Sequence, residues 1–290
     1  MVSALFLFFR KNNNRLTMKK FFTLAWVAMF ALASQAQIVS SRSTHVETVP
    51  EVKEPSRNWS YLYLQYNSVA SGFKMEDEKE ALEGLSLGYN INYRLTDAIP
   101  LFLETGIGLQ IVGKSKIDAS PLASSLSSYY GSKDVSFVMP SVKIPLGASY
   151  VFDIPNTPIS IIPNAGFDLR IIGAAVMDGD ILAEISGHKD WDFCDKDQLE
   201  QRIKDVYNRA IGMSSLSGSA KEMWKKQAEE DAKAFADEYL FKRVQFGCHL
   251  GVSARFWKKL LLGMQYQFDF TETAKDLTMN QFNATLAVCF

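Results

Sequence analysis

The sequence predicts an all-β protein in which eight antiparallel strands run up and down around a closed barrel. Two observations predict this fold. Apolar and polar residues alternate over eight segments of the chain, which is typical of strands with one dry face. The links between these segments are short and long by turns, as hairpins at the two opposite ends of a barrel require.

The alternation is clearest over residues 84–95, where six apolar residues face five small or polar ones. Leu85, Leu87 and Tyr89 share the apolar face, and Ser86 and Asn90 lie on the other. The same period-two pattern places the eight predicted strands at 59–69, 84–95, 101–112, 136–152, 158–172, 243–256, 260–270 and 280–290. Most of these segments are long enough to cross a bilayer when tilted, which takes about 9–11 residues.

The composition of the two strand faces indicates which face points outward and which lines the interior of the barrel. The polar face is rich in Gly, Ser, Asn and Gln, with single charges, whereas a soluble exterior usually carries Lys, Glu and Thr. The apolar face is continuous and bulky, with aromatic residues near strand ends. We therefore expect a transmembrane barrel with its apolar face in lipid. The alternative is a secreted, lipocalin-like barrel with the opposite sense.

The links support the membrane interpretation. Links 96–100, 153–157 and 257–259 are short, and links 70–83, 113–135, 173–242 and 271–279 are longer. With a periplasmic N-terminus, all short turns fall in the periplasm and all long loops outside the cell.

The N-terminal segment resembles an export signal. Met18-Lys19-Lys20 precedes an apolar run over 21–33, and Ser34-Gln35-Ala36 offers small residues for cleavage. We expect a signal peptide at 1–36, with translation from Met18 as an alternative start, an extended periplasmic segment at 37–57, and the barrel at 58–290.

Composition and charge narrow the class further. The 290 residues are 47% hydrophobic and 22% charged, with a mean hydropathy of -0.05. These averages exclude a polytopic helical membrane protein but not a barrel. Residues 1–36 hold five of the 31 basic residues and none of the 32 acidic ones, so the mature chain has 26 bases and a net charge of −6. We therefore expect no nucleic-acid partner.

Three prolines fall inside predicted strands, where each removes a ladder hydrogen bond. A hairpin closing at 153–157 would set Pro145 opposite residue 165 and Pro163 opposite residue 147, close to Pro140. The sequence predicts one bulge or gap there, absorbed by Gly147 and Gly166.

Three features together resemble the porin-like outer-membrane β-barrel proteins of Bacteroidetes, which are similar to the small OmpA- and OmpX-like barrels. They are the signal ending at Ala36-Gln37, the segment Lys143-Ile144-Pro145-Leu146, and the terminal Phe290. The resemblance implies outer-membrane lipid and the barrel-assembly machinery as partners. The residues that resemble the signal read by that machinery are Phe282, Leu286, Val288 and Phe290.

The link 173–242 predicts a helical hairpin in the third extracellular loop. One helix follows Asp197, with Glu200 completing a capping box, and ends at Gly212. The other begins at Ser219, with Glu222 in the same role. Exposed loops on a rigid barrel often carry function, so the loop is a candidate site for an unknown extracellular ligand or surface partner. The alternative is that its apolar stripes only pack on each other and on the rim.

Charged side chains on the predicted inward face form a candidate lumen network that neutralises buried charge, because an isolated buried charge is very costly. The candidates are Arg94, Glu104, Lys143, Asp168, Arg170, His249, Arg255 and Asp269. A narrow ion path is the alternative. His249 and Ser253 carry no catalytic motif, and Cys194, Cys248 and Cys289 form no metal-ligand pattern.

These observations predict a non-enzymatic, integral outer-membrane protein with a plugged lumen and without cofactor or metal. Its role would be surface interaction or envelope support through the extracellular loops. A small-solute porin is the alternative function.

Overall fold

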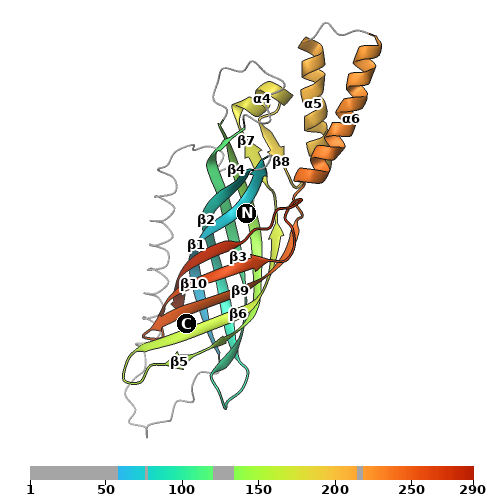
Figure 1. Ribbon diagram of the computed structural model, residues 1–290. Coiled ribbons are helices and arrows are strands. Elements are labelled where there is room, and N and C mark those ends of the chain that lie inside the picture. The colour runs from blue at the N-terminus through green and yellow to red at the C-terminus, as the bar shows by residue number, and fades with distance from the viewer. Residues whose placement is uncertain (1–57, 76–77, 120–133, 214–217) are drawn as a thin grey trace, which may run out of the picture. The chain divides into compact units, whose positions relative to one another are not determined.

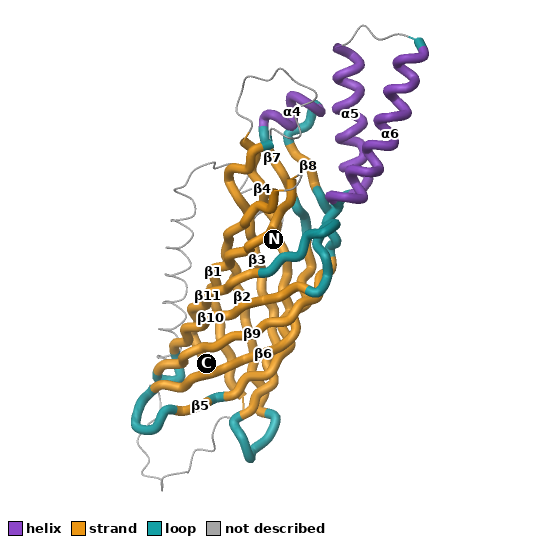
Figure 2. The backbone as a smooth tube through the Cα atoms, viewed as in Figure 1, coloured by secondary structure: helices purple, strands orange, loops and turns teal. Residues whose placement is uncertain are grey.

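A computed structural model describes residues 58–75, 78–119, 134–213 and 218–290 (Figures 1 and 2). The expected signal peptide and the expected periplasmic segment 37–57 lie outside these residues. The strands are β1 (Asn58–Met75), β2 (Glu78–Arg94), β3 (Leu101–Asp118), β4 (Asp134–Tyr150), β5 (Phe152–Asp153), β6 (Ile159–Ile172), β7 (Val176–Asp178), β8 (Asp190–Asp192), β9 (Val244–Phe256), β10 (Leu260–Asp269) and β11 (Gln281–Cys289). The helices are α4 (Asp180–Ser186), α5 (Lys196–Met213) and α6 (Ser219–Tyr239).

Eight of these strands close into an antiparallel barrel, which confirms the predicted fold. Each strand pairs with the next along the chain, in the order β1, β2, β3, β4, β6, β9, β10, β11. Pairing of β1 with β11, from Tyr61 opposite Cys289 to Val69 opposite Gln281, completes the circle. Closure leaves no open edge around the barrel, so every strand finds a partner on both sides.

The prolines interrupt this ladder at three separate places rather than at one. At Pro145 the Cα partners of β3 and β4 skip from Thr105–Leu146 to Gly108–Lys143 without a change of register. Beside Pro163, the β4–β6 pairing stops at Ser149–Asn164 and resumes as Phe152–Ile161. At Pro140, β4 passes from β6 to β7. Each gap lies where the missing proline N–H would have donated.

The predicted partners of these prolines were wrong, although gaps were expected. Pro145 lies opposite Asp168, and the register of the β4–β6 pairing sets Pro163 opposite Tyr150, inside the gap. The reason is that β5 extends the hairpin, so its turn falls after Asp153 and the register moves. Gly147 and Gly166 do oppose each other, and a Cβ on Gly166 would lie 2.4 Å from the Cα of Gly147.

We call the end of the barrel that holds the short turns the lower end, and the end that holds the helices the upper end. The outer surface is apolar over the lower part of every strand. Along β10 the outward residues are Leu262, Met264, Tyr266 and Phe268, which are 39–57% exposed. The inward residues of the barrel include fully buried Lys, Arg, Asp and His. This sense is opposite to that of a lipocalin-like barrel, which holds its apolar residues inside. No helix in the described part of the chain is long and apolar enough to cross a membrane.

Strands β1 to β3 are longer than predicted, β4 begins two residues earlier at the predicted length, and the sense of their faces reverses in the added part. Val69, Leu82, Val112 and Met139 point inward and are at most 1% exposed, and they lie beyond the last polar inward residues of their strands. Farther along the strands, toward the helices, there are charged pairs such as Lys114 with Glu80 and Lys116 with Asp134. The expected loop 70–83 is therefore largely hairpin, because β1 and β2 remain paired up to Met75 and Glu78.

The long third loop folds onto this end of the barrel. Its helices and β7–β8 contribute Ile181, Leu182, Trp191 and Phe193 to one apolar cluster with the reversed strands. We call this assembly the cap. The helices α5 and α6 form the predicted hairpin and pack against each other.

Both predicted capping boxes were wrong. Helix α5 begins at Lys196, because the carboxylate of Asp195, not Asp197, accepts the N–H of Gln198 at 3.0 Å. It also continues past Gly212 to Met213. Helix α6 begins at Ser219 after Gly218, and no side chain caps its first turn.

A charge introduced on the apolar face distinguishes the two barrel classes. Leu250 faces outward from β9 and is 58% exposed. If this face meets lipid, Leu250→Arg should lower the free energy of unfolding by about 2–4 kcal/mol. Urea unfolding in phospholipid vesicles measures this change, with Ala98→Arg in a short turn as the matched control. Equal stability of the two variants would contradict a lipid-facing surface.

Candidate functional site

The first candidate site is the interior of the barrel, where a chain of polar side chains crosses the lumen just below the cap. Gln110 donates to Gln281 at 3.0 Å, Gln281 donates to Gln267 at 2.8 Å, and Gln267 donates to Asp269 at 3.0 Å. Asp269 then accepts a 2.9 Å hydrogen bond from Arg170. The chain joins four of the eight strands and fills the lumen at this level.

The chain of hydrogen bonds continues on both sides. Arg170 also donates to Gln245 at 3.0 Å, and Gln245 donates to Thr273 at 2.8 Å. At the other end, Ser141 donates to Gln110 at 3.3 Å. We call these eight residues, Ser141, Gln110, Gln281, Gln267, Asp269, Arg170, Gln245 and Thr273, the upper girdle. Buried polar groups paired in this way avoid the cost of an unmade hydrogen bond.

A second cluster lies at the middle of the barrel around a buried carboxylate. Asp168 accepts from His249 Nδ1 at 2.8 Å and lies 3.5 Å from the Lys143 ammonium. Lys143 also donates to Gln265 at 3.4 Å. Strands β4, β6, β9 and β10 supply one side chain each, so the cluster joins strands distant in sequence.

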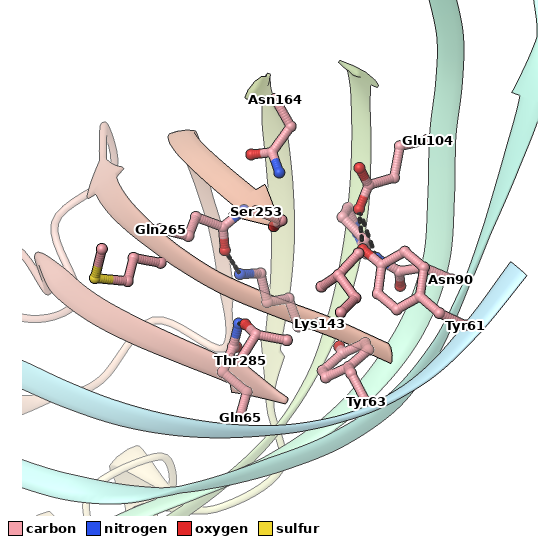
Figure 3. A pocket seen from close by; sticks show the side chains of 13 residues that line it. Tyr61, Tyr63, Gln65, Asn90, Glu104, Lys143, Asn164, Ser253, Gln265 and Thr285 are labelled. Atoms are coloured by element: carbon pink, nitrogen blue, oxygen red, sulfur yellow. Dashed lines mark hydrogen bonds between the residues drawn. The ribbon is translucent and has the colours of Figure 1, made fainter. Parts of the chain in front are cut away.

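The third cluster holds Glu104. Tyr61 donates to its carboxylate at 2.5 Å, and Asn90 donates to the same oxygen at 2.8 Å. In Figure 3, Lys143 and Gln265 lie on one side of a cavity and Glu104 with its two partners on the other. The cavity volume is about 30 Å³, which is room for one or two waters and not for a solute.

The lower end of the lumen is closed by apolar side chains. A second apolar cluster contains Trp59, Phe102, Ile162 and Leu261, each at most 8% exposed. The Arg255 guanidinium stands 4.8 Å from the centre of the Trp59 ring, which favours a cation–π contact. Apolar layers therefore close both ends of a polar interior.

Seven of the eight predicted lumen charges are inside the barrel. Glu104, Lys143, Asp168, Arg170, His249, Arg255 and Asp269 are each at most 8% exposed. Three of them are cations, three are carboxylates, and the seventh is His249, so the formal charges balance when His249 is neutral. Arg94 is at the lower rim instead, where it donates to the carbonyls of Thr96 and Asp97.

Sequence reasoning missed the neutral members of the network. Gln110, Gln245, Gln267 and Gln281 carry the upper girdle, yet only charged residues were selected as candidates. Their signal was available, because each falls on the inward face of an alternating strand. The hydrogen-bond donor Tyr61 shares the parity of Gln65 and Asn67, but an aromatic residue on that face was not considered as a member of a polar network.

The lumen does not assemble a catalytic constellation from the predicted residues. His249 binds Asp168, but Ser253 is four residues farther along the same strand, about 13 Å away at the usual rise of a strand. Within the described ranges, no three His, Cys, Asp or Glu side chains gather closely enough to hold a metal ion.

The second candidate site is the cap. Arg243 fixes its base by donating to the carbonyls of Gly173 and Cys194, at 2.7 and 3.3 Å. Burial raises the pKa of the Cys194 thiol to about 12, so this thiol stays protonated and packs as an apolar group.

Polar and aromatic contacts hold the two helices of the hairpin together. Lys196 and Asp237 form a 2.9 Å ion pair near the base. Farther along, the Tyr207 hydroxyl donates to Asp231, and its ring meets the edge of Trp224 at 5.9 Å between ring centres. Burial, and then the hydrogen bond to Asp231, raise the pKa of Tyr207 to about 12. The hydroxyl therefore keeps its proton, and this bond, at neutral pH.

Removing one partner of the buried ion pair tests whether the upper girdle stabilises the barrel. Asp269→Ala leaves the Arg170 charge unpaired and should lower the free energy of unfolding by about 3–5 kcal/mol. The double variant Arg170→Met with Asp269→Leu removes both charges and should recover most of this loss. Urea unfolding in vesicles compares the two. A double variant no more stable than the single one would contradict the pairing.

Comparison with known proteins reveals only distant similarity. No protein-family model matches the chain, and no curated protein matches it. Among solved structures, the chain is similar to Neisserial surface protein A, with 14% identity, 81% of this chain and 96% of that one covered, and a TM-score of 0.38. It is also similar to Ail of Yersinia pestis in complex with sucrose octasulfate, with 8% identity, coverage of 81% and 99%, and a TM-score of 0.37. The outer-membrane enzyme PagL gives 9% identity, coverage of 79% and 98%, and a TM-score of 0.35.

Proposed function

We propose that this protein is an integral outer-membrane β-barrel with a closed lumen, which acts at the cell surface through its cap and catalyses no reaction. The observation that carries the proposal is the reversal of polarity along β1 to β4. Between the lower apolar cluster and the level of Val69 and Leu82 the apolar residues point outward, and above that level they point inward. A chain that leaves lipid and enters water at that level requires this pattern.

The height of the apolar face supports insertion in a membrane. Outward apolar residues follow β10 from Leu260 to Phe270. Eleven residues at the usual rise and tilt of a barrel strand span about 25 Å, the height of the apolar band of an outer-membrane barrel. Phe290 and Trp257, which are 52% and 65% exposed, lie where an aromatic girdle would meet the lower interface.

The orientation follows from the two ends of the barrel. The short turns after β2, β5 and β9 lie at the end where β1 begins and β11 ends (Figure 1). The cap lies at the other end. In outer-membrane barrels the short turns are periplasmic and the long loops extracellular. The expected signal peptide and assembly signal agree with this orientation.

A closed lumen is favoured over a porin by the layers inside the barrel. A solute would have to pass the cap cluster, the upper girdle and the lower apolar cluster, and the cavity between them holds one or two waters. An eight-stranded barrel has an interior just wide enough for side chains. With the lumen filled, the cap is the part of the molecule left for interaction with the surroundings.

Labelling of single cysteines on intact cells tests the orientation. In a variant whose three native cysteines are replaced by serine, Lys226→Cys on α6 should react with a membrane-impermeant maleimide. Ala98→Cys, in a short turn, should react only after the outer membrane is permeabilised. Both positions are exposed. Labelling of Ala98→Cys on intact cells, or equal labelling in a soluble periplasmic fraction, would overturn the proposal.

Planar-bilayer recording tests the closed lumen. The purified protein, whose folded state is first verified by faster migration on an unheated gel, should insert without stepwise conductance. Residues Trp59 and Phe102 block the lower end and the cap cluster blocks the upper end. A stable conductance step that recurs with protein dose would favour the porin alternative instead.

A further inference from the structure

Arg255 is a buried cation at the lower end of the lumen whose charge no neighbouring side chain neutralises. The other two cations inside the barrel are each paired with a carboxylate. Arg255 is 8% exposed, yet within the described part of the chain it forms no ion pair and its guanidinium donates no hydrogen bond. The Trp59 ring covers one face of the guanidinium and leaves the N–H groups around its edge without an acceptor. An unpaired buried charge is costly, so this guanidinium requires a partner.

Two further N–H groups in this part of the lumen are buried without an acceptor. The indole Nε1 of Trp59 has no hydrogen-bond partner, although the N–H of a buried tryptophan usually has one. Asn92 lies opposite Trp59 in the β1–β2 ladder and is 0% exposed. Its Oδ1 accepts from Ser149 at 3.0 Å, whereas its Nδ2 has no partner. Side chains from β1, β2 and β9 therefore all lack an acceptor here.

The unpartnered groups around the cavity in the middle of the lumen are of the opposite kind. Asn90 and Asn164 line this cavity, and each has a side-chain oxygen that no donor reaches. A water in the cavity can donate to such an oxygen. At the lower end one of the unsatisfied donors is charged, and a water there would leave the charge of Arg255 without compensation. An anion satisfies both requirements.

Two acids close by in the ladders do not pair with Arg255. Arg255 lies opposite Ser160, which in turn lies opposite Asp153 on β5. Ser160 donates to the Asp153 carboxylate at 2.6 Å, and Asp153 is exposed. Glu104, opposite Asn92 in the β2–β3 ladder, accepts from two other side chains. The anion for Arg255 therefore has to come from outside the described part of the chain.

We propose that Arg255, Trp59 and Asn92 bind a carboxylate group that enters from the lower end of the barrel. The Nε–H and one Nη–H of a guanidinium point the same way and match the two oxygens of a carboxylate. A single cation neutralises a single negative charge, which favours a carboxylate over a phosphate dianion. The three side chains are at most 8% exposed, so only a terminal group of the ligand enters. Access from the periplasm is the one point that rests on the proposed function.

Side-chain NMR signals test the site in the folded, full-length protein. The isotope-labelled chain is folded in zwitterionic micelles, and sodium acetate replaces sodium chloride at constant ionic strength. We expect the signals of the Arg255 Nε–H and the Trp59 indole N–H to shift to a plateau as acetate is added. A plateau is required because a specific site saturates, whereas a change of solvent shifts signals linearly.

Variants at the same end of the barrel assign the binding to these residues. Arg255→Met should fold, because it removes an unpaired buried charge, and should abolish the shift of the Trp59 signal. Arg255→Lys keeps the charge without the fork, and Trp59→Phe removes one donor, so each should weaken acetate binding about tenfold. The matched control is Arg94→Gln, which should bind acetate like the unchanged protein. The Arg94 guanidinium already donates to the carbonyls of Thr96 and Asp97.

The outcomes separate the carboxylate site from the proposed function. A chain that does not migrate faster on an unheated gel has not folded as a barrel, which contradicts the proposed function and this site with it. A folded barrel in which the Arg255 and Trp59 signals do not shift, or shift without a plateau, overturns only the carboxylate site. A shift that appears only in Asp153→Asn identifies Asp153 as the partner of Arg255, and also overturns an external ligand.

Discussion

The fold depends on one level along the barrel axis at which the polar and apolar faces of strands β1 to β4 exchange places. Below this level, Arg170 and Asp269 form an ion pair in the lumen, and the outer wall of the barrel is apolar. Beyond it, Val112 and Met139 turn inward, and the outer wall carries Lys116 and Asp134. A strand has only two faces, so this reversal determines which residues form the lumen and which form the cap.

The polar layer under the reversal is possible because the lumen is narrow. Side chains from opposite walls reach one another, so Gln110 on β3 and Gln281 on β11 bond directly at 3.0 Å. A buried ion pair adds little stability by itself, but an unpaired member costs several kcal/mol. The upper girdle and the charge balance of the lumen are therefore coupled, because losing one partner leaves the others unsatisfied.

Much of this fold could be predicted from the sequence, because strand alternation is a local signal. The reversal of the two faces could not be predicted, because alternation identifies an apolar face but does not show whether lipid or other parts of the protein cover it. Val69 was the last residue of the predicted strand 59–69, and Leu82 fell in the predicted loop 70–83, although both are paired in the β1–β2 ladder. The network was predicted by charge alone, so the glutamines that link Arg170 to β3 were missed.

Local signals also failed where tertiary contacts select between neighbouring residues. Asp195 and Asp197 both precede the α5 periodicity, and either could cap it. Asp195 does so because Gln198, one turn in, also binds the backbone N–H of Asp192 at 2.6 Å and holds the first turn against β8. No spacing rule within the helix contains that contact.

The cap then divides into a base that packs on the barrel and a hairpin whose two helices pack on each other. Its apolar cluster uses the base of the hairpin, where Phe241 and Leu199 meet the reversed strands. Farther along, α5 holds α6, because Ala228 and Ala232 are buried and the Trp224 ring meets the edge of Tyr207. The outer turns of the hairpin therefore depend on contacts between the two helices rather than on the barrel.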